Sequence, residues 1–485
     1  MHCILSSLIV RALLVDGTGA PAQQASVRIE GDRIVGLGDL APLPSETVID
    51  AGGLVLAPGF IDTHSHGDDE IFDYPDALAA VSQGITTLVG GQDGGSAHPL
   101  ADYFARLEQT PAAVNVASYV GHGTVRRRVM GEDFRRPARA EEIEKMRQLI
   151  RKDLDAGALG LSAGLEYDPG IYSVREEVIE LAKVASAAGG RYISHIRSED
   201  RYFWEAVEEI IAIGREAKLP VQISHVKLAM RNLWGQADRL IRRLEEARAS
   251  GVDVTADIYP YLYWQSTLTV LFPKRDFENR DEAARVLREI STPEDLLIGK
   301  FKPEPSYLGK TLAEIAALRK QDPVTTLIEM IREAESFRRK GEDDVESVIG
   351  TSMIEPDVEG LMVWPHTNIC TDGQLMGRHP RGFGTFPRVL GRYVRERKLM
   401  SLEEGIRKMT SLAAAHMGFR DRGVVKPGMA ADLVLLDPAT VLDRSTTKEP
   451  QALSIGIEKV WVNGELVYEN GKTTGKRPGK LLRRS

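Results

Sequence analysis

Short apolar segments that alternate with amphipathic helices occupy the middle of this 485-residue chain. Each is bounded by turn or helix signals, which is the pattern of buried strands. Alternation of this kind predicts an α/β fold with a parallel sheet or closed barrel, and eight such strands suit a TIM-like (β/α)8 barrel. The eight candidates are residues 54–61, 85–89, 114–120, 159–163, 192–194, 221–224, 252–256 and 367–370.

Strand-like segments at both ends of the chain flank this middle. Residues 8–56 contain short β-branched runs between turn signals, and residues 424–436 and 457–468 repeat the pattern, the last with an Asn463-Gly464 hairpin turn. We predict one small β-sandwich domain formed by residues 1–56 and 416–485, around a catalytic barrel at 57–415. A charged, proline-broken stretch at about 268–348 is predicted to be an insertion that could serve as a lid.

Composition excludes several classes of protein. The chain has 70 acidic and 62 basic residues with both signs scattered, which argues against nucleic-acid binding. No apolar run reaches the roughly 20 residues of a membrane span. Cys3 and Cys370 are too far apart in sequence for a disulfide framework, and residues 1–10 lack a signal-peptide pattern. We expect a cytoplasmic protein with a small-molecule partner; its oligomeric state stays open.

Two histidines follow the first predicted strand, at the end of the segment Phe-Ile-Asp-Thr-His-Ser-His. Side chains at positions i and i+2 of a strand point to the same face, so His64 and His66 can reach one point beyond the strand. Neutral imidazoles suit a divalent transition metal such as zinc. A lone His-x-His pair is only weak evidence for a metal site. The residues at the ends of the other strands therefore decide whether a metal site is predicted.

Further candidates follow the other strands. The fifth and sixth strands both end in Ile-Ser-His, at His195 and His225, a repetition that core packing does not require. Asp93 follows the second strand in a glycine-rich loop, where it could be a metal ligand or simply a residue of an Asp-Gly turn. Glu166 follows the fourth strand, where it could point into the site or into solvent.

Metal-assisted hydrolysis explains this set of residues. A zinc-type cation lowers the pKa of its water toward about 7, and a second cation could help to polarise the scissile carbonyl. A further carboxylate must move the proton to the leaving nitrogen, and Asp372 after the eighth strand is the candidate. Lys227 lies two residues after His225 and could bind a substrate carboxylate, with tyrosine hydroxyls as donors.

Several motifs together resemble the N-acyl-D-amino-acid deacylases, or D-aminoacylases, of the amidohydrolase superfamily. The resemblance spans nearly the whole chain. The motifs are GFIDTHSH at 59–66, SQGITTLV at 82–89, GHG at 121–123, GLSAGL at 160–165, ISH at 193–195, SHVK at 224–227, DIYPY at 257–261, TDG at 371–373 and HPRGFGTFPR at 379–388.

The resemblance implies a role for each candidate. His195 and His225 would hold a tightly bound zinc ion, and His64 and His66 a weaker second metal. Asp372 would be the acid and base. A substrate carboxylate would be bound by Tyr167, Lys227 and one of Tyr259 or Tyr261, and Arg381 falls in the family's His-Pro-Arg segment.

One position departs from the family pattern. The family usually has a cysteine ligand after the second strand, where this chain has Asp93. Either Asp93 or Glu166 would then replace that ligand. We predict a metal-dependent hydrolase of C–N amide bonds that releases a carboxylate and a D-amino acid through metal-activated water. The alternatives are a cyclic amide hydrolase of the hydantoinase or dihydroorotase kind, a dipeptidase, and a catalytically silent metal-binding scaffold.

Overall fold

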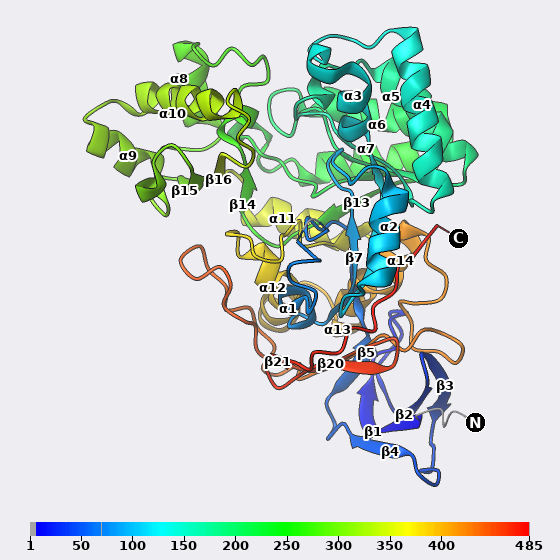
Figure 1. Ribbon diagram of the computed structural model, residues 1–485. Coiled ribbons are helices and arrows are strands. Elements are labelled where there is room, and N and C mark those ends of the chain that lie inside the picture. The colour runs from blue at the N-terminus through cyan, green and yellow to red at the C-terminus, as the bar shows by residue number, and fades with distance from the viewer. Residues whose placement is uncertain (1–5, 69, 485) are drawn as a thin grey trace.

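A computed structural model describes residues 6–68 and 70–484 (Figure 1). A ring of parallel strands lies at the centre, with helices around it. Strands from the N-terminal and C-terminal parts of the chain form a separate β region in the lower part of Figure 1, and an inserted lobe projects at the upper left. Residues 1–5, including Cys3, belong to the predicted terminal domain but lie outside the described residues.

The central strands form a closed ring. Six strands are hydrogen-bonded in the order β17-β13-β12-β11-β10-β9, and three more in the order β6-β7-β8. Leu159, just before β10, donates its backbone N–H to Ser118 of β8, so β8 and β9 act as one interrupted strand. The ring closes where the N–H of Asp372 donates to the carbonyl of His64 at 2.8 Å. This confirms the predicted α/β barrel fold.

The strands of the barrel match the eight predicted segments. Their bounds are β6 (Phe60–Asp62), β7 (Ile85–Gly90), β8 (Asn115–Ser118), β9 (Val120–Gly121), β10 (Gly160–Gly164), β11 (Arg191–His195), β12 (Val221–Ile223), β13 (Val254–Ile258) and β17 (Thr367–Ile369).

The first predicted strand is divided between two sheets. β5 (Val55–Pro58) pairs with strands of the terminal sheet, whereas β6 pairs with β7 of the barrel. The change occurs at Gly59, where a Cβ atom would lie only 2.3 Å from the Thr86 side chain. The predicted boundary after residue 56 therefore falls inside β5, and the chain passes into the barrel at Gly59.

Helices cover the outside of the barrel because each presents one apolar face to the strands. In α6 (Phe203–Ala217), the buried residues Phe203, Val207, Ile210 and Ile211 recur at helical spacing. The other helices that alternate with the strands include α2 (Leu100–Gln109), α3 (His122–Met130), α4 (Ala140–Asp155), α5 (Arg175–Ala187), α7 (Ala237–Ala249), α11 (Glu355–Val363), α12 (Arg381–Arg388), α13 (Leu402–Met409) and α14 (Ser411–Met417).

Both chain ends contribute to one sheet of nine strands, which curls around a small apolar core of its own. Its N-terminal and C-terminal parts also meet where Ile34 donates to the carbonyl of Met429 and Ala431 donates to that of Asp32. The strands are β1 (Ser6–Leu14), β2 (Gln23–Glu30), β3 (Arg33–Gly38), β4 (Thr47–Asp50), β5, β18 (Leu433–Leu436), β19 (Ile457–Val462), β20 (Glu465–Glu469) and β21 (Lys472–Thr473). The predicted hairpin turn at residues 463–464 joins β19 to β20.

The predicted insertion contains strands as well as helices. β14 (Tyr263–Ser266), β16 (Glu346–Thr351) and β15 (Leu296–Phe301) form an antiparallel sheet, so the lobe begins and ends slightly outside the predicted limits of 268 and 348. Its helices are α8 (Arg280–Glu289), α9 (Leu312–Arg319) and α10 (Pro323–Arg338). The first and last of its residues lie beside the barrel opening.

Within residues 6–68 and 70–484, no helix combines the length and the apolar character that crossing a bilayer requires.

Candidate metal centre

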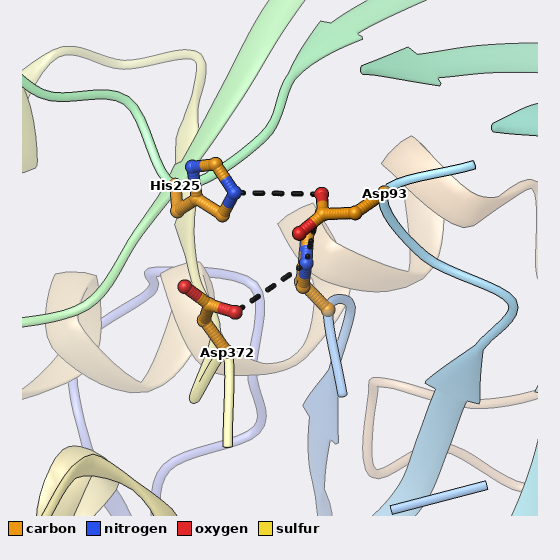
Figure 2. A group of neighbouring side chains, drawn as sticks. Asp93, His225 and Asp372 are labelled. Atoms are coloured by element: carbon orange, nitrogen blue, oxygen red, sulfur yellow. Dashed lines mark ion pairs between the residues drawn. The ribbon is translucent and has the colours of Figure 1, made fainter. Parts of the chain in front are cut away.

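Five side chains that follow four of the barrel strands converge at one end of the barrel. His64 and His66, which follow β6, both face Asp93: the His64 Nε2–Asp93 Oδ1 and His66 Nε2–Asp93 Oδ2 distances are each 3.5 Å. His225, which follows β12, faces the same carboxylate, with 3.4 Å between its Nε2 and Asp93 Oδ1. Figure 2 shows Asp93, His225 and Asp372 pointing toward one another. The carboxyl ends of the strands thus supply the cluster, as the barrel fold predicts.

His195, at the end of β11, completes the group of imidazoles. Its Nδ1 lies 3.1 Å from His225 Nε2, and its ring is 4.4 Å from the Tyr167 ring, centroid to centroid. Burial lowers the pKa of His195 to about 4, so its ring nitrogens are available as neutral ligands.

The spacing of these atoms suits a bound cation. Two ligands about 2.1 Å from a tetrahedral zinc ion lie roughly 3.4 Å apart, which is the spacing of the nitrogens and oxygens found here. Both ring nitrogens of His64 and Oδ1 of Asp93 are buried and have no hydrogen-bond partner in the described part of the chain. Buried polar atoms are costly to leave unpaired, so a metal ion accounts for them where hydrogen bonds do not.

Three of the converging residues have unusual backbone conformations. The φ angles are 52° at Asp93, 34° at His225 and 50° at Asp372. Left-handed φ angles at residues other than glycine cost roughly 1–3 kcal/mol each and concentrate at functional sites. The N–H of His225 donates to the buried Asp257 carboxylate, which holds this strained turn in place.

Asp372 lies at the rim of the cluster. Its Oδ1 is 3.1 Å from His66 Nε2 and 3.6 Å from His64 Nε2, while its Oδ2 pairs with Arg381 Nη1 at 2.6 Å. Burial raises the pKa of Asp372, but Arg381 and the imidazoles of His225, His66 and His64 outweigh this and hold the pKa below its usual range. The carboxylate is therefore ionised, which is the form that a general base requires.

A second layer of carboxylates holds the outer nitrogens of the imidazoles. Glu166 Oε2 lies 2.8 Å from His195 Nε2, and Glu199 Oε1 lies 3.0 Å from His225 Nδ1. Lys227 donates to Glu199 and also lies 2.8 Å from His225 Nδ1. Outer partners of this kind fix the tautomer and orientation of metal-binding histidines.

Glu166 and Glu199 alter the predicted set of residues. Glu166 was expected as a possible ligand; it contacts His195 Nε2, while the other ring nitrogen of His195 faces His225, and this position suits the orientation of His195. Burial, with the nearby Asp200 and Glu199, raises its pKa well above the usual range. Glu199 was not predicted; the segment His-Ile-Arg-Ser-Glu, which places a carboxylate four residues after His195, was the available signal.

The predicted substrate-binding residues fall into two groups. Tyr167 and Arg381 line a cavity of about 380 Å³ between the cluster and the insertion, together with Gln265 and Ser347. Lys227 is buried behind His225, engaged with Glu199.

The two tyrosines of the Tyr-Pro-Tyr segment differ in their hydroxyl contacts. The Tyr259 hydroxyl is buried and has no hydrogen-bond partner within residues 6–68 and 70–484, and the Arg381 guanidinium lies 4.8 Å from the centroid of the Tyr259 ring. The Tyr261 hydroxyl instead donates to the Pro380 carbonyl at 3.4 Å. Of the two predicted candidates, Tyr259 has the hydroxyl that remains available.

The chain has close relatives among curated proteins. The amidohydrolase family profile matches residues 47–293 and 310–468. D-aminoacylase of Alcaligenes xylosoxydans xylosoxydans is 37% identical over 99% of this chain and 97% of its own length. N-acyl-D-glutamate deacylase of the same organism is 36% identical, again over 99% of this chain and 97% of its own length.

A solved structure agrees with these relatives. N-acyl-D-glutamate deacylase from Bordetella bronchiseptica, complexed with zinc and a phosphonate inhibitor, is 35% identical and superposes with a TM-score of 0.89 over 99% of this chain and 100% of its own. A D-aminoacylase structure is described as having a binuclear metal centre. These likenesses confirm the family that the sequence motifs indicated, with its zinc-type cofactor. The chain belongs to the amidohydrolase family and, within it, to the N-acyl-D-amino-acid deacylases.

Proposed function

We propose that this protein hydrolyses the amide bond of N-acyl-D-amino acids and releases a carboxylate and a D-amino acid. The observation that carries the proposal is a buried group in which ligand atoms of His64, Asp93, His225 and Asp372 lie within 4.8 Å of one another. His66 adjoins this group through Asp372, and His195 adjoins it through His225. The full-length likeness to D-aminoacylase and N-acyl-D-glutamate deacylase supports the substrate class.

Asp93 is proposed as the carboxylate shared by two cation positions. One of its oxygens faces His66, and the other faces His64 and His225. A carboxylate with its two oxygens turned toward different imidazoles suits a bridge between two cations. When bound, zinc would lower the pKa of its water toward about 7 and polarise the scissile carbonyl.

Asp372 is proposed to move the proton. Its Oδ1 faces the imidazoles of the cluster, so it can accept a proton from the attacking water and pass it to the leaving nitrogen. Arg381 holds the other oxygen and fixes the direction of the carboxylate.

The substrate carboxylate is proposed to bind on the insertion side of the cluster. Arg381 and Tyr167 line that cavity, and the Arg381 guanidinium lies over the ring of Tyr259, whose hydroxyl has no hydrogen-bond partner among the described residues. Lys227 is already paired with Glu199, so we assign it to the orientation of His225 and place it second to Arg381 for substrate binding.

Cyclic amides are the less favoured substrates. The hydantoinase-like relatives generally have a lysine at the end of the fourth strand, where this chain has Glu166 facing away from the cluster. Solved hydantoinases share the fold only, at 15–16% identity.

The test is a hydrolysis screen of the zinc-loaded protein. N-acetyl-D-amino acids, their L enantiomers and hydantoins are compared by the release of free amine. Release from the D series alone is expected. Turnover of hydantoins with none of N-acetyl-D-amino acids would overturn the proposal.

A further inference from the structure

A second cavity opens from the metal centre beside α3. It has a volume of about 690 Å³ and is lined partly by α3. Asp93, Gly95 and Tyr167 line both this cavity and the one of about 380 Å³ that faces the insertion. A substrate bound at the cluster can therefore extend in two directions.

The size of the second cavity exceeds what a short acyl group needs. Cavities of roughly 300–1,000 Å³ hold whole ligands of drug size. If the amino-acid carboxylate lies beside Arg381, the space toward α3 receives another part of the substrate.

The walls of this cavity carry unused positive charge. Arg127 and Arg128 of α3 line it, and within the described part of the chain neither guanidinium has a hydrogen bond or an ion pair with another residue. Arg127 lies over the Phe134 ring at 4.5 Å, which leaves its N–H groups free.

The negative charges of the same walls are already engaged. Asp168 pairs with Arg275 at 3.0 Å, and Asp93 belongs to the metal cluster. His98 is bound to Asp153 at 2.8 Å. The unpaired charges on the walls of this cavity are therefore those of Arg127 and Arg128. A planar guanidinium group can form two parallel hydrogen bonds with a carboxylate.

We propose that this cavity is a subsite for a second carboxylate of the substrate, held by Arg127 and Arg128. The proposal rests on the proposed deacylase function and narrows its substrate class to dicarboxylic N-acyl-D-amino acids. The second carboxylate belongs either to the side chain of an acidic D-amino acid or to a dicarboxylic acyl group.

The experiment compares three substrates with the zinc-loaded enzyme: N-acetyl-D-leucine, N-acetyl-D-glutamate and N-succinyl-D-leucine. The measured quantity is the ratio of kcat/KM for each dicarboxylate to that for N-acetyl-D-leucine. In the Arg127→Gln/Arg128→Gln double variant, one of the two ratios is expected to fall about tenfold or more, because a charge-assisted hydrogen bond contributes on the order of a tenfold factor or above. The ratio that falls identifies the side of the substrate that enters the cavity.

Arg135→Gln is the matched control. The Arg135 guanidinium also lies over the Phe134 ring, at 5.1 Å, but does not line the cavity, so both ratios should stay at their wild-type values. Unchanged ratios in the double variant, or the same fall with Arg135→Gln, would overturn the subsite while the deacylase function stands. A wild-type protein that hydrolyses none of the three substrates would instead overturn the deacylase function, and the subsite with it.

Discussion

Asp93 is the residue at which this chain departs from its family's usual cysteine, and its two oxygens face different imidazoles. A carboxylate oxygen is a harder ligand than a thiolate and can bind two cations at once. We therefore expect Asp93 to favour a second cation without removing the first.

Metal stoichiometry tests the role of Asp93. Asp93→Ala is expected to lower the zinc content measured by elemental analysis from up to two ions per chain to one or none, because the shared ligand is lost. Asp93→Cys restores the family's ligand and should retain at least one ion. Glu166→Gln should keep the stoichiometry but weaken zinc binding roughly 10- to 100-fold, since it orients His195 without binding metal. Full zinc content in Asp93→Ala would exclude the bridge.

The proton-transfer role of Asp372 is tested separately. Asp372→Asn removes the base but leaves the four imidazoles and Asp93 in place. We expect zinc content near that of the wild type and a loss in kcat of roughly 10²- to 10⁴-fold, the usual contribution of general acid–base catalysis. A kcat close to wild type would remove Asp372 from the mechanism.

The sequence predicted most of the side chains that form the candidate metal centre. Strand alternation placed His64 and His66 on one face, and the repeated Ile-Ser-His placed His195 and His225 at strand ends. It did not predict Glu199 or the outward position of Glu166. The positions of Glu166 and Glu199 depend on which nitrogen of each imidazole faces the candidate metal centre. The pairing of β10 with β11 sets this orientation, and spacing along the chain does not.

Among the elements, the insertion was the least predictable from sequence. Its three helices agree with the charged, helix-rich composition, but its antiparallel sheet was not predicted, because β14 and β16 are separated by about 80 residues and pair only through long-range contacts. The lobe also provides Gln265 and Ser347 to the wall of the active-site cavity.

Arg275 joins the insertion to the barrel. It donates to the Glu166 carbonyl at 2.7 Å and to Asp168 at 3.0 Å, and within the insertion to the carbonyls of Thr269 and Phe272. It therefore ties the lobe to the loop that carries Tyr167.

Removal of Arg275 should loosen the lobe. Arg275→Ala is expected to speed limited proteolysis of the insertion and to lower kcat/KM about tenfold, because several hydrogen bonds to a part-buried guanidinium are lost. Arg280→Ala serves as the control, since among the described residues Arg280 has its hydrogen bonds and ion pair with Asp322 and Thr325, both inside the lobe. Identical proteolysis of Arg275→Ala and wild type would show that Arg275 does not hold the lobe.

For the whole molecule, the C-terminal segment links the terminal sheet to the barrel. Gly479 and Leu482 donate to the carbonyls of Ala112 and Val116, and Arg484 donates to that of Gly157. The sequence predicted that both chain ends form one β region. It did not predict that the last residues return to the barrel, because that segment lacks a strand or helix pattern.

Deletion of residues 479–485 should therefore weaken the barrel itself. We expect the Tm measured by differential scanning fluorimetry to fall by roughly 2–5 °C, from the loss of several backbone hydrogen bonds and the packing of Leu481 and Leu482. Zinc content should stay constant, since the segment lies far from the cluster in sequence and contributes no ligand. An unchanged Tm would show that the return to the barrel adds no stability.

The most direct test of the metal centre is anomalous diffraction at the zinc edge from crystals of the zinc-loaded protein. The account predicts anomalous density enclosed by His64, His66, Asp93, His195 and His225, with Asp372 beside it and Glu166 outside the coordination shell. Zinc density elsewhere, or none between these side chains at full zinc loading, would contradict it.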